Sequence, residues 1–239
     1  MTVAILYHSH QPDGRPVKYE AEIMRRLDAA VRVHQPDAQI VGVVREVRPT
    51  MPQSWQYVAL KHQGDRHLDH WRRILAGLAL VKCQTVYLVD HDSLYVPENF
   101  ADSELPPDQF QFNPDYVSLT RRGWFIRKNE PGCFNCRGPR DLFNEHFGKA
   151  AALVADGNVC AWDEPGFCRI NDRRGKPVFF RQVCAGIGYW RTALLNVDLR
   201  DGCNMTGDYL APSYQEAVEP WGNWRELWRA LQFPENADR

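Results

Sequence analysis

Two aspartates, one residue apart, follow a run of apolar residues near the middle of this 239-residue chain. The run extends from Val86 to Val89, and Asp90 and Asp92 follow it. Four consecutive apolar residues predict a strand buried on both faces, as in a parallel sheet, and ligands bind beyond the carboxyl ends of such strands. In an extended segment both carboxylates project to the same side. Two such oxygen donors suit Mg²⁺ or Mn²⁺, although a solvated acidic turn has the same sequence.

Strands and helices alternate through the first hundred residues, and they must position these aspartates. The spacing of apolar residues predicts strands at 2–7, 39–44 and 55–60 and helices at 20–34 and 65–81. The second helix leads into the strand that ends at Asp90. Such alternation is typical of βαβ units, so the sequence predicts an α/β fold with a mainly parallel sheet flanked by helices.

From Glu98 onward prolines, glycines and charged residues interrupt the apolar runs, which predicts a loop-rich second half. A helix is expected from Arg140 to Val154. Helical spacing from Trp221 to Phe233 predicts a C-terminal helix that packs on the core, with a partner-binding or oligomer-forming helix as the alternative. Short strands are expected at 110–112, 116–119, 124–127 and 178–183.

The composition is that of a globular protein with a sizeable core. Hydrophobic residues make up 44% of the chain and aromatic residues 12%, while the net charge is −1. This balance gives no general attraction to nucleic acid or anionic membranes. The sequence contains no apolar stretch of the roughly 20 residues that span a bilayer and no signal peptide, so a cytoplasmic protein is expected. Seven scattered cysteines do not form a secreted disulfide framework.

Residues 61–64, 73–78 and 86–100 together resemble the nucleotide-diphospho-sugar glycosyltransferases of the GT-A type. A narrower resemblance, to phage and bacterial glycosyltransferase-like proteins, centres on the segment Asp90-His91-Asp92-Ser93-Leu94-Tyr95. The motif of that group reads roughly Glu-His-Asp-Val-Leu-Tyr, so Asp90 stands where Glu is frequent. Asp201 stands where the group has the His of an Arg-His-Gly triplet. The narrower resemblance is carried by residues 90–100 and by the later segments 110–113, 164–166 and 198–207.

The resemblance implies a single GT-A-like, Rossmann-like domain over residues 1–239. Its parts would be a nucleotide-sugar-binding half (1–100), an acceptor and catalytic half (101–210) and a C-terminal helical tail (211–239). It also implies a metal-dependent glycosyltransferase of the hexosyltransferase type, which moves a sugar from a nucleotide-diphosphate sugar, in the first place a UDP-sugar, to an acceptor hydroxyl. Mn²⁺ or Mg²⁺ would be held by Asp90 and Asp92, with Asp201 at the third position.

Further residues are candidates for donor binding. Tyr7, His8 and Ser9 follow the first strand, where this type of fold places the base and the ribose. Asp90 is expected on the ribose or on a metal-bound water. Three cationic side chains on the elements that lead into the site are candidates for contact with the diphosphate, or are simply solvated: Lys61, His67 and Arg73.

An inverting transfer needs a base that deprotonates the acceptor hydroxyl. In the enzymes that this sequence resembles, the base is an acidic residue beyond the metal motif. Glu164 is the first candidate and Asp163 the second. Trp162, Pro165 and Phe167 would desolvate this carboxylate and raise its pKa. The alternative is a Pro-Gly turn whose acidic side chain faces water.

The cysteines allow a second metal hypothesis. Cys133 and Cys136 form a C-x₂-C pair, and Cys160 and Cys168 follow. Four thiolates can hold a structural zinc ion, but the second pair is separated by seven residues instead of two to four. Buried free thiols are the alternative.

The acceptor and the function class stay open at this stage. Basic and aromatic residues interleave at 121–128 and 169–181, a pattern that fits a nucleic-acid backbone or solvated loops. Phage relatives suggest a hydroxymethylated pyrimidine in DNA as acceptor, in which case the compartment is the host cytoplasm. Saccharide, protein and small-molecule acceptors are alternatives. Two other functions are possible for this sequence: a pyrophosphorylase-like enzyme and a non-catalytic nucleotide-sugar-binding module. The first is disfavoured because residues 8–14 contain a single glycine and so do not form a glycine-rich phosphate loop.

Overall fold

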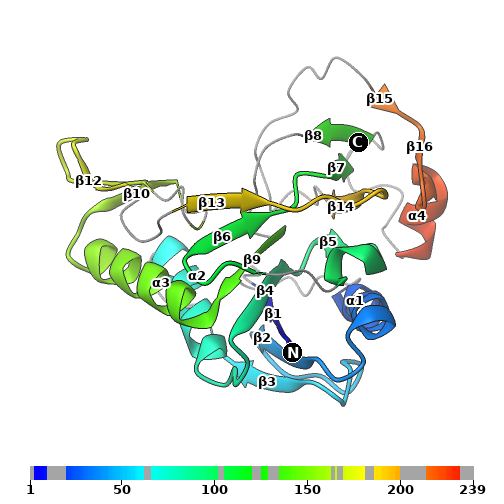
Figure 1. Ribbon diagram of the computed structural model, residues 1–239, viewed down its shortest axis with the longest axis horizontal. Helices are drawn as coiled ribbons and strands as arrows, with labels where there is room; N and C mark the ends of the chain where they lie inside the picture. Colours follow the sequence, from blue (N-terminus) through cyan, green and yellow to red (C-terminus); the bar gives the residue numbers. More distant parts are fainter. Residues whose placement is uncertain are drawn as a thin grey trace.

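A seven-stranded sheet forms the centre of the fold (Figure 1). The computed structural model describes residues 3–9, 20–61, 66–101, 105–119, 125–128, 135–162, 165, 169–180, 186–199 and 214–231. Across the sheet the strands are β13 (Gly186–Tyr189), β6 (Gln109–Phe112), β9 (Asn135–Pro139), β4 (Thr85–Asp90), β1 (Val3–His8), β2 (Gln39–Val44) and β3 (Gln56–Ala59). Only β9 runs antiparallel to its neighbours. The predicted α/β class with a mainly parallel sheet is confirmed.

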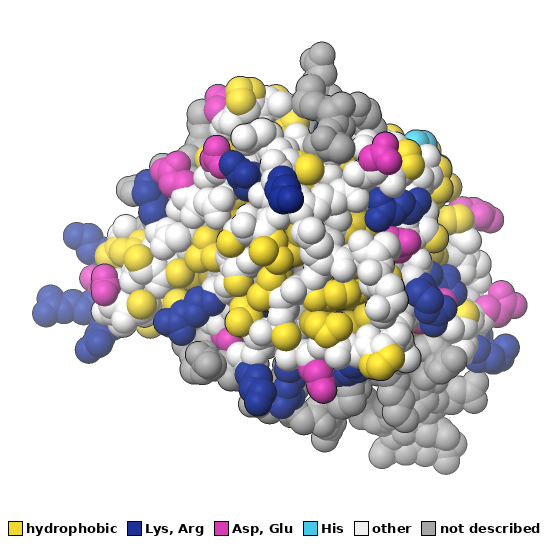
Figure 2. Space-filling model, turned by 90° about the horizontal axis from the view of Figure 1, so that it is seen from below, with side chains coloured by type: hydrophobic (Ala, Val, Ile, Leu, Met, Phe, Trp, Pro, Cys, Tyr) yellow, Lys and Arg dark blue, Asp and Glu magenta, His cyan; other side chains and the backbone are white. Residues whose placement is uncertain are grey.

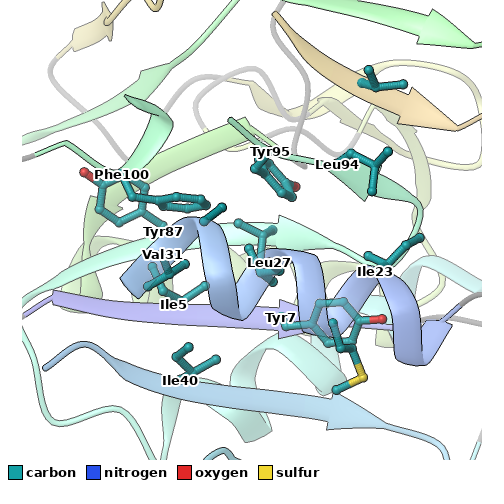
Figure 3. Packing of buried hydrophobic residues seen from close by; sticks show 14 of the residues in the cluster. Ile5, Tyr7, Ile23, Leu27, Val31, Ile40, Tyr87, Leu94, Tyr95 and Phe100 are labelled. Atoms are coloured by element: carbon teal, nitrogen blue, oxygen red, sulfur yellow. The ribbon is translucent and has the colours of Figure 1, made fainter. Parts of the chain in front are cut away.

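Helices cover both faces of this sheet. They are α1 (Glu20–His34) on one face and α2 (Arg66–Leu78) with α3 (Arg140–Ala155) on the other. Side chains of β1 alternate between the two faces, as the strand period requires: Ile5 packs with Leu27 of α1 (Figure 3), and Leu6 packs in the cluster that contains Trp71 of α2. The apolar run of each central strand is therefore explained by burial on both sides.

One glycine sets the distance between α2 and the sheet. A Cβ atom on Gly77 would lie 2.6 Å from Val43 Cγ2 and closer still to Leu6 Cδ1. The helix therefore lies against the sheet at a separation that only glycine allows at this position.

A second, five-stranded sheet shares an apolar cluster with α1. In order it contains β15 (Tyr214–Gln215), β8 (Phe125–Lys128), β7 (Tyr116–Leu119), β14 (Asn196–Leu199) and β5 (Ser93–Leu94). Leu94, Val117 and Val197 belong to the apolar cluster that also contains residues of α1 and of the face of the large sheet that α1 covers. Because β5 follows β4 after a two-residue turn, the second sheet begins directly beyond Asp90.

Smaller elements complete the described chain. They are the 3₁₀ turn η1 (Pro97–Phe100), a three-stranded antiparallel sheet of β10 (Val159–Trp162), β11 (Arg169–Asn171) and β12 (Pro177–Phe180), the pair β16 (Ala217–Val218) and β17 (Gly222–Asn223), and α4 (Trp224–Ala230). The C-terminal helix begins later than predicted because the Asn223 side chain accepts a hydrogen bond from the Arg225 N–H and caps it. None of the described helices is both long and apolar enough to cross a bilayer.

Candidate metal and nucleotide site

The candidate site lies where the order of strands in the large sheet reverses. From β1 the chain continues to β2 and β3 on one side, and it then returns to place β4 on the other side. Ligands of open α/β sheets bind at this kind of switch point, beyond the carboxyl ends of the two strands. His8 and Asp90, the last residues of β1 and β4, are register partners there.

Asp90, His91 and Asp92 form a group that is compatible with a metal ion. Each offers one ligand atom, and these atoms lie within 4.8 Å of one another. The predicted reason for this convergence was wrong. The chain does not continue as an extended strand after Asp90 but turns at His91 and Asp92. The Leu199 N–H of β14 donates to the Asp92 carbonyl oxygen at 2.7 Å and ties this turn to the second sheet.

His91 neutralises part of the acidic charge in the metal-free protein. Its ring Nδ1 lies 2.6 Å from Asp90 Oδ1, and its backbone N–H donates to the same oxygen at 2.7 Å. Burial alone would lower the pKa of His91, but the carboxylates of Asp92 and Asp90 outweigh it and raise the pKa to about 10. The imidazole is therefore a cation at neutral pH. The carboxylates of Asp90 and Asp92 form the donor set that fits Mg²⁺ or Mn²⁺.

Tyr7 and Glu20 form a buried pair beside this group. The Tyr7 hydroxyl donates to Glu20 Oε1 at 3.3 Å, and the Tyr7 ring packs edge-on against Trp55. Burial, followed by the charges of Glu20 and Asp90, raises the pKa of Tyr7 and keeps its hydroxyl protonated. Because the Tyr7 side chain is fully buried, it presents no exposed ring face to a nucleobase in this structure. Glu20 was not among the predicted residues, since an acidic residue in a first helical turn is common.

A buried ion pair on α2 contacts Ser9, the residue that follows β1. Arg73 Nε donates to Asp69 Oδ2 at 2.7 Å, and Arg73 Nη1 donates to the Ser9 carbonyl oxygen at 3.3 Å. Both charged side chains are almost fully buried. The His8 ring lies 3.9 Å from Asp90 Oδ1 through its Nδ1, and it stacks edge-on against His70. Arg73 is therefore buried against Ser9 and does not lie on the solvated surface of the helix.

Some of the remaining predicted residues belong to the described part of the chain and others do not. His67 lies at the start of α2 near Trp71, and Lys61 is exposed directly beyond β3. Cys136 is buried in the apolar core on β9, and Cys160 packs partly buried against the same cluster. Five predicted residues lie outside the described part of the chain: Asp163, Glu164, Asp201, Cys133 and Cys168. The third metal ligand, the base and the zinc site therefore stay predictions.

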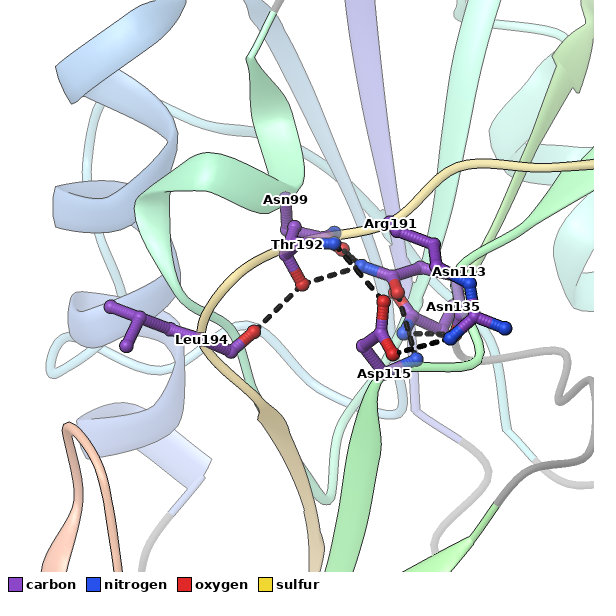
Figure 4. A network of polar contacts seen from close by, with 7 residues as sticks. All are labelled: Asn99, Asn113, Asp115, Asn135, Arg191, Thr192 and Leu194. Carbon is purple, nitrogen blue, oxygen red and sulfur yellow. Dashed lines mark hydrogen bonds and ion pairs between the residues drawn. The ribbon is translucent and has the colours of Figure 1, made fainter.

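A network of polar contacts links several segments near the ends of strands (Figure 4). Asn113 Nδ2 donates to Asn99 Oδ1 at 2.9 Å, and Asn135 Nδ2 donates to the Asn113 carbonyl oxygen at 2.7 Å. Asp115 accepts from Arg191 Nη1 at 2.8 Å and from the Thr192 N–H at 3.2 Å. These contacts join η1 and the ends of β6, β9 and β13, and the sequence gives no local signal for them.

The sequence matches no protein-family model and no curated protein. Similar solved structures include HddC from Yersinia pseudotuberculosis, with 10% identity over 83% of this chain and 93% of that chain and a TM-score of 0.45. The inositol-1-phosphate CTP transferase from T. maritima has 9% identity over 85% and 91%, with a TM-score of 0.44. The CMP:2-keto-3-deoxy-manno-octonic acid synthetase complexed with CTP has 12% identity over 80% and 90%, with a TM-score of 0.41. Similarities this distant assign neither a family nor an activity.

Proposed function

We propose that this protein is a metal-dependent glycosyltransferase that uses a nucleotide-diphosphate sugar, in the first place a UDP-sugar, as donor. The observation that carries the proposal is the Asp90–His91–Asp92 group at the switch point between β1 and β4. Carboxylates at the carboxyl end of a strand, next to the loop where a nucleotide binds in open α/β sheets, are suited to hold a diphosphate through a divalent cation.

In this proposal Asp90 and Asp92 hold Mn²⁺ or Mg²⁺. The cation would supply Lewis-acid stabilisation of the charge that develops on a diphosphate leaving group. The protein's own groups fix the site around it: His91 orients the Asp90 carboxylate, and Arg73 holds the Ser9 carbonyl at the end of β1. The first hundred residues would form the donor half, and residues 101–210 the acceptor half.

The base of the reaction is proposed to be Glu164, with Asp163 second. Either carboxylate would accept the proton of the acceptor hydroxyl as the new glycosidic bond forms and the bond to the diphosphate breaks. Asp201 is proposed as a further metal ligand. Glu164→Gln is expected to abolish transfer while the affinity for the donor stays within about twofold, since a neutral amide keeps the shape but cannot take the proton.

For the acceptor, a hydroxymethylated pyrimidine in DNA is supported by a basic turn between β11 and β12. Asp172 Oδ1 accepts hydrogen bonds from the backbone N–H groups of Arg174 and Lys176, both at 2.8 Å. The side chains of Arg174 and Lys176 are exposed. Figure 2 shows Lys and Arg side chains projecting from the end of the molecule where Figure 1 places β12. Exposed cations of this kind suit a phosphate backbone. A saccharide or protein acceptor is the alternative.

The test is a product analysis with nucleotide sugars. Purified protein is incubated with UDP-sugars and Mn²⁺, and released UDP and free or transferred sugar are quantified. Release that depends on the metal and is lost in Asp92→Asn supports the proposal. Pyrophosphate release from a nucleoside triphosphate would instead indicate a pyrophosphorylase-like enzyme. Donor binding without any turnover would indicate a non-catalytic binding module.

A further inference from the structure

Arg137 is a cation buried between the large sheet and Trp190. It lies on β9 with 2% of its surface exposed. Its register partners are Gln111 of β6 and Tyr87 of β4, so the three side chains share one face of the sheet. The guanidinium lies over the ring of Trp190, with its central carbon 4.6 Å from the ring centroid.

All contacts of this guanidinium within the described chain are with neutral groups. Nε and Nη2 donate to Gln111 Oε1 at 2.9 and 2.6 Å, and Nη1 donates to the Tyr87 hydroxyl at 3.0 Å. A guanidinium has five N–H donors, so one N–H on each terminal nitrogen is left after these three bonds. Burying a cation without a negative partner is costly. In the described residues no carboxylate forms an ion pair with Arg137.

Two neighbouring polar atoms are also buried and find no hydrogen-bond partner among the described residues. They are Trp190 Nε1, in the ring that Arg137 stacks on, and Asn135 Oδ1, two residues before Arg137 on the same face of β9. The orientation of the Asn135 amide is fixed because its Nδ2 donates to the Asn113 carbonyl oxygen at 2.7 Å. Buried polar groups in native proteins are nearly always satisfied, so these atoms indicate a missing ligand.

We propose that Arg137 and Trp190 form a binding site for the carboxylate or phosphate group of a small ligand. The two remaining N–H groups of Arg137 suit two oxygens of one planar or tetrahedral anion, which is the geometry that arginine recognises best. Trp190 Nε1 adds a third donor. A hydroxyl next to the anionic group would donate to Asn135 Oδ1. Arg137 is the register partner of Tyr87, three residues or about 10 Å before Asp90 along the strand, whereas Asn135 is the register partner of Val89, directly before Asp90. The site therefore adjoins the metal group but uses none of its residues.

The test uses inorganic phosphate and acetate as separate probes, in EDTA and at constant ionic strength. Calorimetric titration and thermal unfolding give the affinity and the shift of the midpoint for the wild type. Arg137→Lys keeps the charge but loses the planar fork, and Trp190→Phe keeps the ring but loses the donor. Each variant is expected to bind the better probe at least about tenfold more weakly, because hydrogen bonds to charged groups are among the strong ones. Trp224→Phe is the matched control, since Trp224 Nε1 is also buried and has no hydrogen-bond partner within the described part of the chain, but lies on α4. It should bind like the wild type.

Saturable binding in the wild type and Trp224→Phe, weakened in the other two variants, supports the site. Competition then identifies the source of the anion: displacement of the probe by UDP assigns the site to the donor, and no displacement assigns it to another anionic ligand. Identical titrations for all four proteins, or no saturable binding of either probe to a folded wild type, would overturn the proposal. Because EDTA removes divalent cations, this result does not depend on the proposed metal site.

Discussion

The Tyr95 hydroxyl accepts a hydrogen bond from the backbone N–H of Asp90 at 3.1 Å. Tyr95 is almost fully buried, and it follows Asp90 by five residues across the turn that contains the metal group. The bond therefore closes the turn and fixes the backbone of a proposed metal ligand from behind.

Removal of the Tyr95 hydroxyl should make the orientation of Asp90 less well defined. In Tyr95→Phe the Asp90 N–H loses this hydrogen bond in a partly buried setting, which costs about 1 kcal/mol of unfolding free energy. We expect Mn²⁺ affinity, measured by calorimetric titration, to fall by at least about fivefold because the Asp90 carboxylate is less well oriented.

Tyr57→Phe is the matched control for this change. The Tyr57 hydroxyl donates to the Pro52 carbonyl oxygen at 2.8 Å, away from the metal group. It should lose stability in urea denaturation without a change in Mn²⁺ affinity. Equal Mn²⁺ affinity in both variants would show that Tyr95 has no part in positioning Asp90.

Asp92→Asn should weaken Mn²⁺ binding more strongly than Tyr95→Phe. A neutral amide is a poorer ligand for a hard divalent cation than a carboxylate, and the expected loss of affinity is at least about tenfold. The exposed Glu145→Gln, which removes the same charge from α3, should have no effect on the titration. Unchanged Mn²⁺ binding in Asp92→Asn would exclude this residue as a ligand.

The charge of His91 predicts how stability depends on pH in the metal-free protein. Its pKa is raised from 6.5 to about 10 in the folded state, so the folded protein binds this proton more tightly than the unfolded chain. This contribution to stability is fully present below pH 6.5 and is lost as the pH rises toward 10. Between these values the unfolding free energy should fall by at most about 1.4 kcal/mol per pH unit.

Urea denaturation in EDTA at pH 7, 8 and 9 measures this slope. His91→Gln removes the titrating group, so its unfolding free energy should depend less on pH than that of the wild type. Parallel pH profiles for the two proteins would mean that His91 titrates normally in the folded state.

Removal of only one charge of the Asp69–Arg73 ion pair should lower the unfolding free energy strongly. Asp69→Asn leaves the buried Arg73 guanidinium without its carboxylate, which typically costs about 3–5 kcal/mol. The double variant Asp69→Leu with Arg73→Met removes both charges and should recover much of that stability. If Arg73 also orients the Ser9 carbonyl for a nucleotide, the double variant should still bind UDP more weakly than the wild type. A double variant as unstable as Asp69→Asn would contradict the first expectation.

The sequence predicts those helices and strands in which the spacing of apolar residues within the element determines which side is buried. The helix at 20–34 and the strand at 39–44 have the predicted bounds, because their apolar spacing alone decides which side is buried. Strand β9 has no such pattern. Its Asn135 and Arg137 are buried only because Asn113, Gln111 and Tyr87, far away in the sequence, supply hydrogen-bond partners.

The candidate site likewise has features that the local sequence predicts and features that only tertiary contacts determine. The Asp90–Asp92 pair is visible from composition after an apolar run, but its convergence depends on a turn that period-two reasoning does not predict. Glu20 and the Tyr95 hydroxyl reach the group only through tertiary structure. Local patterns find chemically active residues, and contacts distant in sequence decide how those residues are held.

Two glycines on helices should respond in opposite directions to alanine. In Gly77→Ala the new methyl group would lie closer to the Leu6 and Val43 side chains than van der Waals contact allows, so α2 must move away from the sheet. Overpacking of this kind typically costs about 1–3 kcal/mol. Gly148 on α3 has no heavy atom within 4 Å of the corresponding position, so Gly148→Ala should stabilise the protein by about 0.5–1 kcal/mol through helix propensity. Urea denaturation of both variants measures the two effects. Stabilisation by alanine at both positions would mean that α2 does not pack against β1 and β2 as closely as described here.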